Sequence, residues 1–264
     1  TSGATLSARA NTGGVYLLEA DAVSVGAVGL SINRVGSDGS TVLVTDASQS
    51  DLRTGGGNGA IVLRSTGGAI SLSDGANADG VAISAHGSGN VLVQTLGANQ
   101  DITAGANADI SSSSGNISLL GAGSVVFNAG ADIRTSSTAA GSGSIDVLAG
   151  SGAITQDASS ALVSGGASAT ARLQAATGVT VGDIELNDGA VSISAGTGSI
   201  VDADALVGGA NDADQDISAS ALRLNAGGGV GESLNHLETS VATLSALATN
   251  GVVYKLEADA VSVG

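Results

Sequence analysis

Carboxylates are the side chains of this sequence best able to do chemistry, and many of them gather between residues 202 and 216. The acids of this stretch are Asp202, Asp204, Asp212, Asp214 and Asp216. Alternate acids in an extended loop can place several oxygens around Ca²⁺, which prefers six to eight such ligands. An EF-hand loop also needs a Gly and a distal Glu at set positions, and this stretch does not supply that combination. We therefore favour a solvated acidic loop, and structural Ca²⁺ is the one cofactor that the sequence leaves open.

A second acidic group contains Asp183, Glu185 and Asp188. On a strand, Asp183 and Glu185 would lie on the same face, because side chains alternate with a period of two. Such a pair is compatible with a β-helical enzyme that cleaves glycosidic bonds with two carboxyl groups. Ligand grooves also need apolar and aromatic lining with a few polar groups, and no aromatic, Arg or Lys lies nearby in the sequence. We interpret the pair as surface acids that keep the protein soluble.

Other catalytic patterns are missing from the sequence. The two histidines, His86 and His236, stand in AHGSGN and LNHLE, far from each other along the chain. The sequence has no Gly-x-Ser-x-Gly elbow. It also has no phosphate-binding Gly-Lys-Ser/Thr, since the single lysine, Lys255, follows Tyr254. We expect no catalytic, cofactor-binding or metal-ligating residues, and we expect that the protein is not an enzyme.

The composition predicts a scaffold of short strands and tight turns. Of 264 residues, 42% are hydrophobic, yet only Tyr16, Phe127 and Tyr254 are aromatic. The chain has 42 Gly and no Pro, Cys, Met or Trp. Val, Ile and Leu favour strands, whereas Gly, Ser, Asn and Asp favour turns. Missing proline fits stacked strands, because proline cannot donate a hydrogen bond to a sheet.

Charge narrows the partners that the chain can have. Twenty-four acidic residues against eight basic ones give a formal net charge of −16. Such a surface repels phosphate backbones, so we expect no nucleic-acid partner. No run of 18 apolar residues occurs, so we expect no membrane span.

The sequence repeats itself at long range. Residues 5–26 and 243–264 match at 17 of 22 positions, so the second window restarts the first at an offset of 238 in the numbering. Tyr16 and Tyr254 are equivalent positions in this match. We interpret residues 1–264 as one continuous segment: one long repeat plus the start of the next. A tandem array or a self-associating fibre is the partner arrangement that this repeat predicts.

A shorter, irregular period of about 20 to 30 residues predicts the fold. Strand-like runs occur at 69–72, 90–93, 116–119, 144–147, 190–193 and 222–225. The marker Gly-Ala-Asn-x-Asp occurs at 75–79, 97–101 and 105–109, with the variant GGANDAD at 208–214. These features predict an all-β fold, a right-handed parallel β-helix of about ten coils, with Gly, Asn and Asp at corners of positive φ. At about 4.8 Å per strand, ten coils rise roughly 50 Å.

Other folds fit less well. Residues 234–247 form the one passable amphipathic stretch, although their Ser and Thr content suits a strand equally well. A left-handed β-helix would show a hexapeptide rhythm. A calcium-loaded β-roll needs tandem nonapeptides with Asp, which GGGNGAIVL at 55–63 lacks. Separate β-sandwich domains would need larger hydrophobic anchors.

The strings GNISLLGAGSVVFNAGADI (115–133) and LRLNAGGGVGESLNHLETSVATLSALA (222–248) resemble filamentous-haemagglutinin-type adhesins and the giant β-strand-repeat surface proteins of Gram-negative bacteria. This resemblance covers nearly the whole chain and implies a right-handed β-helical shaft, export to the cell surface, and adhesion or cell–cell contact. It transfers no functional residue. We therefore expect a structural or adhesive segment of an extracellular bacterial fibre that contacts surface glycans or other cells. The alternatives are a β-helical polysaccharide-processing enzyme and a Ca²⁺-dependent glycan-binding module.

Overall fold

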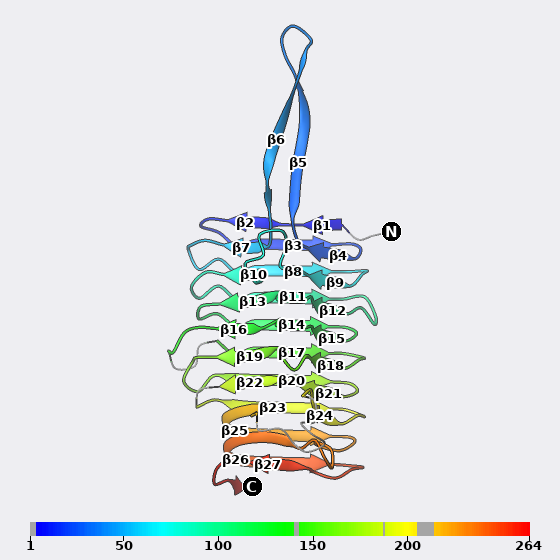
Figure 1. Ribbon diagram of the computed structural model, residues 1–264, viewed down its shortest axis with the longest axis vertical. Coiled ribbons are helices and arrows are strands. Elements are labelled where there is room, and N and C mark those ends of the chain that lie inside the picture. The colour runs from blue at the N-terminus through cyan, green and yellow to red at the C-terminus, as the bar shows by residue number, and fades with distance from the viewer. Residues whose placement is uncertain (1–3, 140–142, 187, 205–213) are drawn as a thin grey trace.

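The fold is all-β, and nearly all of its strands run parallel in one elongated stack (Figure 1). The computed structural model describes residues 4–139, 143–186, 188–204 and 214–264. These ranges contain 28 strands and no helix. Residues 237–248 form a strand, which removes the helical alternative for the stretch 234–247.

The strands fall into three columns, here called A, B and C, in which each strand pairs in parallel with the next along the stack. Column A contains β1 (Ala4–Leu6), β4 (Val23–Val25), β9 (Ile70–Leu72), β12 (Ile102–Ala104), β15 (Val125–Phe127), β18 (Ile154–Gln156), β21 (Val179–Val181) and β24 (Ile200–Asp202). Single bridges from Ile200 to Val230 and from Val230 to Val253 extend it.

Columns B and C together form the larger sheet. Column B contains β2 (Ala8–Ala10), β7 (Leu52–Thr54), β10 (Val81–Ala85), β13 (Asp109–Ser112), β16 (Ile133–Thr135), β19 (Ala161–Ser164), β22 (Asp183–Leu186), the first halves of β25 (Ile217–Ala226) and β26 (Leu237–Ala248), and β27 (Lys255–Glu257). Column C contains β3 (Val15–Glu19), β8 (Ile61–Ser65), β11 (Val91–Thr95), β14 (Ile117–Gly121), β17 (Ile145–Ala149), β20 (Thr170–Ala175), β23 (Ala190–Ala195), the second halves of β25 and β26, and β28 (Ser262–Val263).

The chain visits the columns in the order B, C, A and then starts again one strand further along the stack. All six strand-like runs in the sequence are confirmed as strands. Five of them belong to column C, which explains their similar texture. The run at 69–72 belongs to column A instead. The solenoid-like, parallel all-β architecture therefore follows the short period of the sequence.

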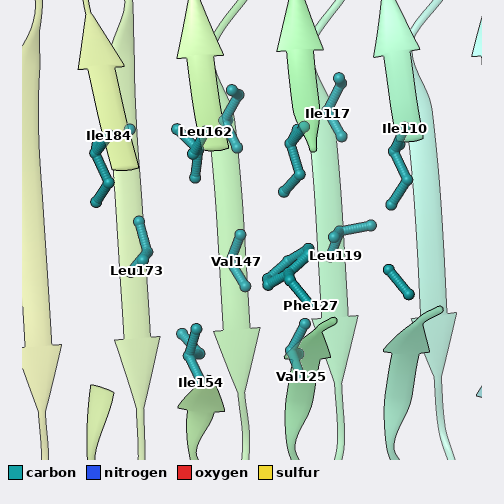
Figure 2. Close-up of a cluster of buried hydrophobic side chains, with 14 of the residues drawn as sticks. Ile110, Ile117, Leu119, Val125, Phe127, Val147, Ile154, Leu162, Leu173 and Ile184 are labelled. Atoms are coloured by element: carbon teal, nitrogen blue, oxygen red, sulfur yellow. The ribbon is translucent and has the colours of Figure 1, made fainter. Parts of the chain in front are cut away.

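The core is a set of apolar ladders enclosed by the three columns. Strands of column C alternate buried and outward side chains, so equivalent inward residues stack one above the other, as Ile117 stacks on Ile145. Figure 2 shows Leu119, Val147 and Leu173 in such a ladder, with Phe127 from column A facing it. Every buried apolar group adds about 25 cal/mol per Å² removed from water. A thin core of medium-sized side chains thus replaces the large aromatic anchors of a globular domain.

Corners confirm part of the turn prediction. Each of the three Gly-Ala-Asn-x-Asp markers carries a left-handed residue: Gly75 (φ 72°), Asn99 (φ 57°) and Asn107 (φ 54°). Glycine also serves a different purpose at the turn that leads into column C. A Cβ on Gly115 would lie 2.1 Å from the carbonyl oxygen of Gly89, and one on Gly89 would lie 2.3 Å from that of Gly59. These glycines permit successive backbones to touch.

We expect Gly115→Ala to lower the free energy of unfolding by about 1–3 kcal/mol, because the added methyl must displace a backbone. Gly13→Ala is the matched control, since nothing lies within 4 Å of a Cβ there. Urea unfolding followed by circular dichroism measures both. Equal stability of the two variants would show that the stacked turns tolerate a side chain.

One element lies outside the columns, whereas the sequence predicted a single continuous solenoid over residues 1–264. Strands β5 (Val28–Val35) and β6 (Thr41–Gln49) form an antiparallel hairpin that projects from the N-terminal end of the stack along its long axis (Figure 1). Two alternating runs separated by the five residues GSDGS are typical of a hairpin, and this pattern is present in the sequence.

The two matching windows of the long repeat lie at opposite ends of the stack and in different columns. Val15 begins β3 in column C, whereas its equivalent, Val253, extends column A. Likewise Leu6 lies in column A and Leu244 in column C. The pairing partners differ as well, because the first window stacks on β7, β8 and β9, whereas the second pairs with β25 and β26. Position in the stack thus decides which column the same residues occupy.

Candidate functional site

The structure brings together three of the five acids between residues 202 and 216. Asp202 is the last residue of β24, the last strand of column A. Asp216 directly precedes β25, whose first half belongs to column B. One carboxylate oxygen from each of Asp202, Asp204 and Asp216 lies within 4.8 Å of the others. Asp214 lines a different hollow, and Asp212 lies outside the described residues.

Hydrogen bonds hold this carboxylate cluster (Asp202, Asp204 and Asp216) in place. Asp202 accepts from Asn235 Nδ2 at 2.7 Å and from the Asp204 backbone N–H at 2.7 Å. Asp216 accepts from the backbone N–H of Glu238 at 2.7 Å. The cluster therefore joins the loop after column A to the next two strands of column B.

Burial and mutual repulsion shift the titration of this cluster. Asp216 is 2% exposed, and its desolvation raises its pKa far above the ordinary value, with the neighbouring charge of Asp202 acting in the same direction. A buried carboxyl beside another carboxylate keeps a proton because two like charges cannot both ionise there. A shared proton or a bound cation would each neutralise the cluster. With one oxygen from each of the three described carboxylates, other oxygens would have to complete the six to eight ligands that Ca²⁺ prefers.

The second acidic group forms one side of an open hollow on the outer face of column B. Asp183 and Glu185 alternate with the buried Ile184 and Leu186 on β22, which confirms that they share a face. Together with Asp214, Gln215 and Ser218 they line a volume of about 680 Å³, here called the acidic hollow. Asp188 lies beyond the strand, in a turn with φ 55°, and does not line it.

In the acidic hollow the carboxyl group of Asp183 titrates abnormally. Burial, followed by the charges of Asp214 and Glu185, raises its pKa to about 6. Stability from this group is complete below the unfolded pKa near 4 and is lost as the pH rises through 6.

We expect Asp183→Asn to raise the free energy of unfolding by about 1 kcal/mol at pH 7.5, after allowing for solvent screening, and to change nothing at pH 4. Urea titrations at both pH values measure this difference. Asp188→Asn removes the same charge outside the acidic hollow and controls for net charge. An equal gain at both pH values would mean that the effect of Asp183→Asn is not electrostatic.

The histidines do not meet. His86 is exposed at the turn between β10 and β11, as its sequence context predicts. His236 packs near Tyr254, with ring centroids 5.9 Å apart. Neither histidine lines the acidic hollow.

A largely apolar hollow of about 600 Å³ runs along the start of column C and was not predicted from the sequence. Its rim carries a two-pronged ion pair in which Arg172 donates to both carboxylate oxygens of Asp146, at 2.8 and 2.9 Å. The two residues are register partners on the neighbouring strands β17 and β20. Only the strand register, which sequence patterns do not give, brings them together.

Comparison with known proteins gives no match: no family model, no curated protein and no solved structure corresponds to the chain. Within its described ranges the chain has no helix long and apolar enough to cross a membrane. Function must therefore be argued from the fold and from the two acidic groups.

Proposed function

We propose that the chain is a structural and adhesive shaft segment of a large secreted or surface-anchored bacterial fibre, folded as a right-handed β-helix of about ten coils. The single observation that carries the proposal is the parallel stacking of columns B and C from β2 to β28, with column A stacked beside them from β1 to β24. Each coil contacts its neighbours along the stack, so length and stiffness come from nearest-neighbour interfaces. Such a stack can separate two surfaces without any catalytic chemistry.

Sequence resemblance and surface charge add to the proposal. The resemblance to filamentous-haemagglutinin-type adhesins adds export and contact with surface glycans or other cells. A net charge of −16 disfavours lateral sheet pairing between shafts. Copies of the chain, or tandem copies of its long repeat, would then join end to end.

The alternative is a β-helical polysaccharide-processing enzyme, and the acidic hollow is the observation that favours it. Asp183, whose pKa burial raises to about 6, lies beside Glu185, and a carboxyl group with a raised pKa can donate a proton to a leaving group. The hollow is, however, lined by no aromatic, Arg or Lys among the described residues. A Ca²⁺-dependent glycan-binding module would instead depend on the carboxylate cluster. We rank both below the shaft.

Electron microscopy of the purified chain tests the shaft proposal directly. We expect rods of uniform width that lengthen by end-to-end association, with no release of reducing sugars from a panel of acidic and neutral polysaccharides. Compact particles that never elongate would contradict the proposal. Sugar release that Asp183→Asn abolishes would establish the enzyme, and chelator-sensitive signals on a glycan array would establish the binding module.

A further inference from the structure

The hairpin β5–β6 exposes several apolar side chains on one face, which a binding partner could cover. Cross-strand pairs place Leu30, Ile32, Val42 and Val44 on one face, with Arg34 opposite Val42 toward the tip and Asp46 opposite Leu30 toward the base. Leu30 is 57% exposed and Val42 is 62% exposed. A two-stranded hairpin is marginally stable alone in water, and exposed apolar patches mark interaction sites.

The position of the hairpin limits what can cover it. Its base is fixed at the first coil, where Gln49 Nε2 donates to Ser7 Oγ at 3.3 Å. From there the strands run past β1 and β2 along the axis of the stack (Figure 1). Any copy of the chain that stacks on this end must therefore lie beside the hairpin.

The column order permits such head-to-tail stacking. At one end, the outermost strands are β27 in column B and β28 in column C. At the other end they are β1 in column A, β2 in column B and β3 in column C. Following β28 by β1 continues the order B, C, A without a break.

We propose that, in a head-to-tail stack, the hairpin of one copy lies along the outer face of column B of the adjoining copy and places Arg34 in the acidic hollow of Asp183, Glu185 and Asp214. This inference rests on the proposed function, because it requires shafts that join end to end. The partner is a second copy of this chain.

Distances along the axis support placing Arg34 in the acidic hollow. Arg34 stands six positions beyond Val28, the base of the hairpin, which corresponds to about 20 Å at roughly 3.4 Å per residue. On the adjoining copy, the strands of column B follow one another inward from the end in the order β27, β26, β25 and β22. Strand β22 carries Asp183 and Glu185. These three steps and the step across the junction from β2 of the first copy make four strand spacings of about 4.8 Å, roughly 19 Å. The arginine and the carboxylates therefore meet at the same level.

Charge and shape support the same placement. Arg34 is exposed and forms no ion pair among the described residues. The acidic hollow gathers three carboxylates, and the repulsion between them is relieved by a cation. A smaller hollow of about 180 Å³ beside Leu256 shares Asp214 and Gln215 with it. The two hollows lie next to each other along the last strands of column B, where the hairpin would pass.

Cysteine cross-linking tests the proposal, because the chain has no cysteine of its own. Val42→Cys marks the face of the hairpin that carries Arg34, and Ser218→Cys marks the acidic hollow while keeping its carboxylates. Mixing the two full-length variants under mild oxidation should give a disulfide-linked pair in at least 10-fold greater yield than Val42→Cys with Ser118→Cys on column C. Electron microscopy of the same mixtures reports whether rods have stacked.

Charge reversal gives a second readout. We expect Arg34→Glu to weaken end-to-end association at least 10-fold in sedimentation velocity, and Glu185→Arg to do the same. Mixing these two variants should restore association, because each supplies the charge that the other has lost.

Three outcomes would overturn the inference. If rods stack but Val42→Cys links to Asp46→Cys instead, hairpins pair with one another tip to base, and the shaft proposal survives. Stacked rods without any hairpin cross-link would mean that the hairpin faces solvent, again with the shaft intact. Single particles that neither stack nor cross-link would remove both proposals together.

Discussion

Asp216→Asn is expected to stabilise the protein increasingly as the pH rises. The raised pKa of Asp216 means that folding takes up a proton, because the unfolded side chain is already ionised above about pH 4. The contribution of this group to stability is complete below the unfolded pKa and is lost as the pH rises toward the folded one. The amide of asparagine has no proton to take up and can still accept from Glu238. The gain over the natural chain should grow by up to about 1.4 kcal/mol per pH unit between pH 5 and 8.

Denaturant unfolding of both chains at several pH values measures this slope. A flat difference would mean that Asp216 is ionised in the folded protein, with a cation in place of the proton. Calcium chloride compared with magnesium chloride at equal ionic strength separates the two cases. A bound Ca²⁺ would stabilise the natural chain in proportion to the logarithm of its concentration, and Asp216→Asn would abolish that response. We expect no such response, since the described cluster offers few ligands.

Local patterns predict the strands of this fold well because each coil repeats the same small choices. Alternation in NISL and SIDV fixes which side chains face inward, and Gly75 and Asn107 provide corners that other residues resist. The fold class follows from these choices with little contribution from distant sequence. The hairpin was not predicted because its alternation looks like that of the columns, and only the turn residues GSDGS between its two runs mark it locally.

The sites depend on register, which local patterns do not contain. Asp202 and Asp216 are not neighbours in the sequence, and they meet because column A ends where column B begins again. Asp183 and Glu185 could be placed on one face of a strand from their spacing alone. That Asp214 joins them depends on the path of the chain between columns. The two repeat windows also show that register is not contained in local sequence, since Tyr16 and Tyr254 share their neighbours in sequence but not in space.

Phe127→Ala is expected to have the largest effect of a single core substitution, a loss of about 3–5 kcal/mol in the free energy of unfolding. Phe127 is 4% exposed in column A, and its register partners are Ala104 on one side and Gln156 on the other. Its ring fills the cross-section where neighbouring coils supply smaller or polar side chains, so truncation leaves a cavity that the ladder has no apolar group to close. Tyr16→Ala, at a ring that is 70% exposed, is the control and should cost less than about 1 kcal/mol.

The location of the damage matters as much as its size. In a stack held together by nearest-neighbour interfaces, a cavity weakens its own coil and the two beside it before the ends are affected. Hydrogen exchange of the Phe127→Ala chain should therefore show early loss of protection in β12, β15 and β18, with β21 to β24 protected longer. Uniform loss along the chain would mean that the coils unfold as one cooperative unit. The shaft would then owe its stiffness to long-range cooperativity, and a single weak coil would endanger its whole length.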